Sequence, residues 1–124
     1  MILSSGLVHG FELTLPPSPA WTDLTRDLVA TGVTPLDLGL DRFQDLLVLT
    51  DRVVSEMLEL PGATTVRVSF SIVGDALEMI VEATGADEAP APISELALSV
   101  LADEHWHTIT ENGVTAGFSL IAHV

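Results

Sequence analysis

The chain has 124 residues, of which 48% are hydrophobic, and it contains no cysteine. Four arginines and no lysine stand against eighteen acidic residues, which gives a formal net charge of −14. The lack of cysteine excludes disulfides, thiolate metal sites and cysteine nucleophiles. The charge repels phosphates, so direct binding to nucleic acid or to an anionic membrane is not expected.

The length and the apolar fraction are sufficient for one hydrophobic core. No apolar run approaches the roughly 18 residues that a membrane-spanning helix needs. Residues 1–10 lack the basic region that precedes the apolar stretch of a signal peptide. We therefore expect residues 1–124 to form a single domain in the cytoplasm.

The first third of the chain predicts a strand followed by a helix. Leu7–Leu15 alternates apolar and polar residues, which is typical of a half-buried strand, and two prolines end it. Ser18 is a suitable N-cap before Pro19, and Gly32 marks the end of the helix. The residues expected to pack this helix onto the core are Trp21, Leu24, Leu28 and Val29.

A linker, Val33–Gly39, leads to the most informative stretch, the predicted helix Leu40–Leu60. At 100° per residue, its core face contains Phe43, Leu46, Leu47, Thr50, Val53, Val54, Met57 and Leu58. The opposite stripe contains Asp41, Asp45, Val48, Arg52, Glu56 and Glu59. One side of this helix is therefore expected to build the core, and the other to carry any function that the helix has.

The second half of the chain predicts two hairpins separated by a helix. Its strands are Thr64–Ile72, Ala76–Ala83, His105–Thr110 and Val114–Val124, and its helix is Ile93–Asp103, with apolar residues at Ile93, Leu96, Ala97, Val100 and Leu101. Strands joined by tight turns pair antiparallel. The chain is thus expected to be α+β, a two-layer α/β sandwich with a mainly antiparallel sheet and helices on one face.

The order of these segments resembles the RsbW-like anti-sigma-factor kinases, whose fold is that of the histidine-kinase-type ATPases. The resemblance rests on ELTLPPSPAWTDLTRDLVA, LDRFQDLLVLTDRVVSEMLEL, VRVSFSIVGDALEMIVEA and LALSVLADEHWHTITENGVTAGFSLIAHV. It implies a shortened, Bergerat-like domain.

The same resemblance places Arg52 where the family has its catalytic Glu, and Glu56 where it has a magnesium-binding Asn. A guanidinium stays protonated and cannot act as a base. The family's glycine-rich adenine turn and phosphate lid correspond here only to Thr84–Pro92, TGADEAPAP, which is short and acidic. We therefore expect a degenerate nucleotide site, with no catalytic residue, no cofactor and no metal.

The resemblance and the charge together predict a non-catalytic regulator that acts by protein–protein binding. The expected partner is a sigma factor or an antagonist of the sulfate-transporter/anti-sigma (STAS) type, and a homodimer is possible. The candidate partner-binding residues are Arg52, Glu56, Asp45, Glu59 and Trp21. The alternative is that the helix stripe is a solvated face with local ion pairs and that Trp21 belongs to the core.

Two other functions remain open on the sequence. The chain could be an active ATP-dependent serine kinase or ATPase that uses Glu56 for magnesium. It could instead bind an apolar small molecule between the long helix and Thr84–Pro92.

The His-x-His pair of His105 and His107 also suggests a metal site, with a third ligand from His123 or an acidic loop. The alternative there is an exposed strand edge with Trp106 turned toward the core.

Overall fold

The computed structural model describes residues 2–3, 9–33, 38–88 and 92–122. In chain order the elements are β1 Ile2–Leu3, β2 His9–Leu15, the 3-10 helix η1 Pro19–Trp21, α1 Thr22–Gly32, α2 Gly39–Leu58, β3 Thr65–Val73, β4 Ala76–Thr84, α3 Pro92–Leu101, β5 Glu104–Ile109 and β6 Gly113–Ile121. Within the described residues the predicted strands and helices are confirmed, with ends that differ by a few residues, whereas residues 7–8 and 123–124 of the predicted strands lie outside them. The two-residue strand β1 was not predicted. Most of the predicted linker after Val33 lies outside the described residues.

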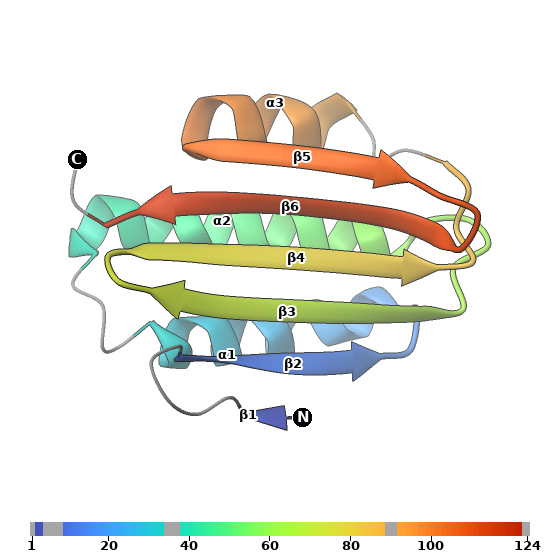
Figure 1. The fold of residues 1–124 in the computed structure, drawn as a ribbon, viewed down its shortest axis with the longest axis horizontal. Coiled ribbons are helices and arrows are strands. Elements are labelled where there is room, and N and C mark those ends of the chain that lie inside the picture. The colour runs from blue at the N-terminus through green and yellow to red at the C-terminus, as the bar shows by residue number, and fades with distance from the viewer. Residues whose placement is uncertain (1, 4–8, 34–37, 89–91, 123–124) are drawn as a thin grey trace.

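The described strands form one sheet in the order β1-β2-β3-β4-β6-β5, in which all neighbours are antiparallel. A tight turn at Gly74, with a φ of +64°, joins β3 to β4. The helices pack on one face, and no described element covers the other (Figure 1). The predicted α+β two-layer sandwich is therefore confirmed.

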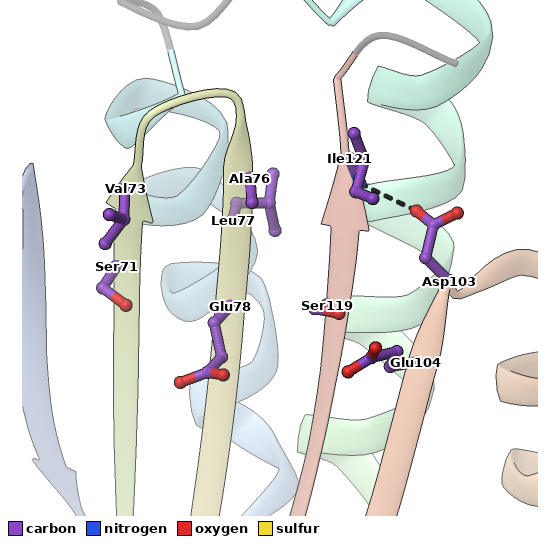
Figure 2. A pocket seen from close by; sticks show the side chains of 9 residues that line it. All are labelled: Ser71, Val73, Ala76, Leu77, Glu78, Asp103, Glu104, Ser119 and Ile121. Atoms are coloured by element: carbon purple, nitrogen blue, oxygen red, sulfur yellow. Dashed lines mark hydrogen bonds between the residues drawn. The ribbon is translucent and has the colours of Figure 1, made fainter.

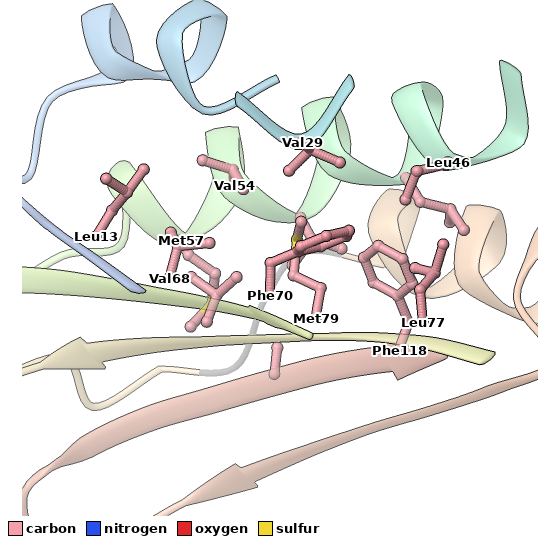
Figure 3. Close-up of a cluster of buried hydrophobic side chains, with 14 of the residues drawn as sticks. Leu13, Val29, Leu46, Val54, Met57, Val68, Phe70, Leu77, Met79 and Phe118 are labelled. Atoms are coloured by element: carbon pink, nitrogen blue, oxygen red, sulfur yellow. The ribbon is translucent and has the colours of Figure 1, made fainter. Parts of the chain in front are cut away.

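The core lies between the helices and the covered face of the sheet (Figure 3). Alternate residues of β3 and β4 point into it, because successive side chains of a strand face opposite ways. The rings of Phe11 and Phe70 stack there at a centroid distance of 5.3 Å. Phe118, Leu46 and Met79 are fully buried in the same cluster.

The helix α2 supplies the other side of this core, largely as predicted. Phe43 and Leu47 are only partly buried, whereas Leu49, which was not predicted, is fully buried. The hydroxyl of buried Thr50 donates to the carbonyl of Leu46 at 2.8 Å, so burying it leaves no polar group unpaired.

The predicted core face of the first helix is wrong at its start. Trp21 is 37% exposed and Leu24 is exposed too, while Thr22 and Thr25 occupy the inner face. The buried stripe of α1 contains Thr22, Thr25 and Val29, so the helix packs through the face next to the one that Trp21, Leu24 and Leu28 predict. Val29 is buried as expected.

The predicted apolar face of the third helix is only partly correct. In α3, Ala97 and Leu101 are partly buried as predicted, whereas Leu96 and Val100 are exposed and Leu98, which was not predicted, is buried. The helix lies along the β5 edge of the sheet (Figure 1). Because it packs on the rest of the molecule from one side only, it buries a narrow stripe of its surface. The side chain of Ile93 lies outside the described residues. Among the described helices, none is long and apolar enough to cross a membrane.

Candidate functional site

Three of the five predicted partner-binding residues line one groove on the outer surface of the helix layer. The groove measures about 730 Å³ and is lined by Pro19, Thr22, Asp23, Arg26, Val48, Asp51, Arg52, Ser55, Glu56 and Glu59. Arg52, Glu56 and Glu59 are therefore brought together between α1 and α2. Asp45 and Trp21 do not line this groove.

An ion pair between the two helices crosses the groove. One Arg26 nitrogen lies 3.2 and 3.1 Å from the two carboxylate oxygens of Asp51, and a second lies 3.3 Å from Asp23. The Asp51 carboxylate raises the pKa of Arg26 above its usual value, through the hydrogen bond and then through the charge. Arg52 and Glu56 also have interaction partners. This groove is therefore a partly self-neutralised surface.

Asp45 belongs to a different cluster, at the junction of α2, α3 and β5. Arg42 lies 3.9 Å from Asp45 and donates to Asp103 at 2.7 Å and to the Leu101 carbonyl at 3.2 Å. Asp103 also accepts the Ile121 backbone N–H at 2.7 Å. These contacts hold the amino-terminal end of α2 to the end of α3 and the edge of the sheet, which is a structural role.

The loop that the resemblance aligns with the family's nucleotide lid, Thr84–Pro92, packs elsewhere. In its described part, the Gly85 N–H donates to the Asn112 carbonyl at 2.8 Å, and Ala86 is buried. A Cβ on Gly62 would lie 2.9 Å from the Gly85 carbonyl oxygen, so the two turns touch. No residue of Thr84–Glu88 lines the groove that holds Arg52 and Glu56. Among the described residues, this loop therefore shares no pocket with Arg52 and Glu56, the residues that the resemblance aligns with the family's nucleotide site.

The histidines of β5 lie on the helix-covered face, not on the open one. His105 pairs in register with buried Phe118, and His107 pairs with Ala116. Trp106 therefore points to the open face, opposite to the predicted core position. Among the described residues, no group of three or more His, Cys, Asp or Glu side chains is placed to hold a metal ion. His123 lies outside the described residues.

The sequence reasoning missed a hollow of about 490 Å³ on the open face of the sheet. It is lined by Ser71, Val73, Ala76, Leu77, Glu78, Asp103, Glu104, Ser119 and Ile121. Glu78 on β4 and Glu104 on β5 flank Ser119 of β6, as Figure 2 shows. The alternation of polar residues in the predicted strands does indicate that one face of the sheet is uncovered. It does not give the register that brings residues of distant strands together.

No protein-family model matches this chain, and no curated protein matches it. The resemblance to the anti-sigma kinases therefore stays a prediction from the order and character of the segments.

Proposed function

We propose that this chain is a non-catalytic regulatory protein that acts in the cytoplasm by binding another protein. By its resemblance to the anti-sigma factors, the partner is a sigma factor or a STAS-type antagonist, and the binding controls transcription. The mechanism is competition, in which a preformed surface covers part of the partner without phosphoryl transfer.

The arrangement of charge is the observation that carries this proposal. Arg26, Arg42 and Arg67 each lie within 4 Å of two carboxylates of the same molecule. These three cations are thus used internally, and the other acidic side chains that the structure describes are exposed, apart from half-buried Glu56, in a chain with a net charge of −14. Such a field attracts a basic protein surface and speeds its capture.

The placement of the expected nucleotide residues supports binding over catalysis. Phosphoryl transfer needs a base, a metal ligand and a phosphate-binding loop around one point in space. Arg52 and Glu56 line a groove between two helices, and no residue of Thr84–Glu88 lines it. Arg52 could contact a partner there but could not activate a hydroxyl.

The test is capture followed by reconstitution. The tagged chain is incubated with cytoplasm of its native cells, bound proteins are identified by mass spectrometry, and the best candidate is purified and titrated directly. We expect a sigma factor or STAS-domain protein at a stoichiometric ratio, with an association rate that falls as salt rises.

The same preparation is titrated with ATP and magnesium in a calorimeter. The proposal expects no binding heat. A clear heat with ATP, together with phosphate transfer to a captured protein, would replace the proposal with the kinase alternative. Recovery of neither a sigma factor nor a STAS-domain protein would contradict the assigned partner class.

A further inference from the structure

The open face of the sheet arranges its side chains in rows across the strands. One row contains Ser71, Glu78, Ser119 and Glu104, which are consecutive partners on β3, β4, β6 and β5. The two glutamates in this row are separated by one strand, so their Cα atoms lie about 10 Å apart. Serine, with its short side chain, stands between them, which leaves the hollow open above β6 (Figure 2).

Apolar side chains flank this acidic row on both sides. Toward one end of the sheet lie Val73 and Ile121, which are 58% and 40% exposed. Toward the other lie Ile80 and Trp106, both partly buried, in register through Gly117. Carboxylates between two apolar strips suit a ligand that is both basic and apolar.

Trp106 lies across β6 because position 117 is a glycine. A Cβ there would overlap two indole atoms, so any other residue would displace the ring from its present position. Trp106 and Glu104 are two residues apart on the same face, about 7 Å along the strand. An indole next to a carboxylate favours a guanidinium, which can stack on the ring and donate to the acid.

The charges on the rest of this face single out the hollow. Arg67 lies 3.3 Å from Glu82 and 3.9 Å from Glu12, so it neutralises those acids. No described residue forms an ion pair or a side-chain hydrogen bond with the carboxylate of Glu78 or Glu104. Asp103, at the rim, is already held by Arg42 and the Ile121 N–H. The two glutamates are therefore the acids that an incoming cation would meet.

We propose that the open sheet face around Glu78, Glu104 and Trp106 binds a basic, apolar-flanked segment of a protein partner, with an arginine in the hollow. This inference rests on the proposed function and assigns that function a surface and a partner chemistry. A two-fold pairing centred on the hollow would bring the glutamates of two copies together, so a basic segment suits this site better than a second copy of this chain.

The test uses a short synthetic peptide that carries Arg-Ile-Arg in a glycine and serine frame. Its control is the same peptide with citrulline for arginine, which keeps the shape and removes the charge. The protein variant Glu78→Gln/Glu104→Gln should bind the arginine peptide about tenfold more weakly than the wild type. The wild type should bind the citrulline peptide no more tightly than the variant binds the arginine peptide.

A charge-matched variant separates this surface from the overall field. Asp27→Asn/Asp41→Asn removes the same two charges from exposed positions of the helix layer and should leave peptide affinity within about twofold. Equal losses for both variants would mean that binding follows net charge alone and would overturn the inference. No binding of the arginine peptide, or concentration-dependent dimers that the Glu78→Gln/Glu104→Gln variant strengthens, would overturn it too.

A third variant, Glu56→Gln/Glu59→Gln, keeps this inference distinguishable from the proposed function. It is compared with Glu78→Gln/Glu104→Gln in titrations of the partner purified after capture. A loss confined to Glu56→Gln/Glu59→Gln would place the partner on the α1–α2 groove, which overturns the sheet-face assignment and leaves the proposed function intact. A loss confined to Glu78→Gln/Glu104→Gln would support both.

Discussion

The two faces of the sheet are made by the same strands and have opposite chemistry. In β3, Val66, Val68 and Phe70 are buried under the helices, while the intervening Arg67 and Ser69 point to the open side. The helix-covered face is mostly apolar and closely packed, with the two histidines of β5 at its edge, whereas the open face combines carboxylates, serines and a few large apolar groups. Alternation alone produces this division, since neighbouring residues of a strand face opposite ways.

This difference separates what holds the molecule together from what it offers to others. Substitutions on the covered face are expected to cost folding free energy, because they leave cavities in a packed core. Substitutions of the exposed polar residues of the open face are expected to leave the free energy of unfolding nearly unchanged and to alter binding. The predictions below test that separation, beginning with the largest expected effect.

The sharpest comparison uses two adjacent residues of β6 that face opposite ways. Phe118 is fully buried and Ser119 lies on the open face. Phe118→Ala should lower the free energy of unfolding by about 3–5 kcal/mol, whereas Ser119→Ala should change it by less than about 0.5 kcal/mol. Urea denaturation followed by circular dichroism measures both. Similar losses for the two variants would show that the open face is also part of the core.

On the open face, Gly117 packs closely against the ring of Trp106. Gly117→Ala pushes a methyl group into the indole of Trp106 and should lower the free energy of unfolding by about 1–3 kcal/mol. In a Trp106→Ala background the same change should cost less than half as much, because the ring is gone. A double-mutant cycle in urea measures this coupling. Strictly additive losses in the free energy of unfolding for the two substitutions would contradict the contact between residue 117 and Trp106.

Asp103 holds the edge of the sheet to the helix layer. Asp103→Asn weakens its bonds to Arg42 and to the Ile121 N–H, and should lower the free energy of unfolding by about 1 kcal/mol. Asp87→Asn, which removes the same charge from an exposed loop position, is the control and should have little effect. Thermal melts of both variants at equal salt check this.

The smallest effect is expected in the α1–α2 groove. Arg26→Gln removes the ion pairs with Asp51 and Asp23, whose side chains are solvent-exposed, so the loss of stability should be small and should vanish at high salt. The pKa of Arg26 is raised in the folded protein, so its ion pairs add stability. That contribution is complete at any pH below the pKa of Arg26 in the unfolded chain, and it is lost only as the pH rises through the pKa in the folded protein. The contribution of Arg26 to the difference in the free energy of unfolding between wild type and variant should therefore be constant between about pH 6 and pH 9.

The regular parts of the fold were predictable, because their periodicity is set by one layer packing on another. The helix α2 lies across the sheet and buries a broad stripe, so a period of 3.6 residues located it almost to the residue. The helix α3 lies at the edge and buries little, and its apolar sequence misled the prediction of its inner face. Trp21 was misplaced because α1 buries the neighbouring face, which contains Thr22 and Thr25, and the apolar pattern does not single out that face.

The candidate surface on the sheet could not be read from the sequence. Glu78 and Glu104 are 26 positions apart and come together only because β6 inserts between β4 and β5. Likewise, Trp106 appears on the open face only once its register with Gly117 is known. Strand order and register are long-range properties, and local pattern does not determine them.

The two tryptophans of the chain allow the most direct test, because one lies on each layer. Trp21 is at the start of the helix layer and Trp106 is on the open sheet face. In an ¹H–¹⁵N correlation spectrum their two indole N–H signals are assigned with Trp21→Phe and Trp106→Phe, and the Arg-Ile-Arg peptide is added. The account predicts that the Trp106 signal shifts with peptide concentration and that the Trp21 signal stays in place. A shift of Trp21 with Trp106 unmoved would contradict the account.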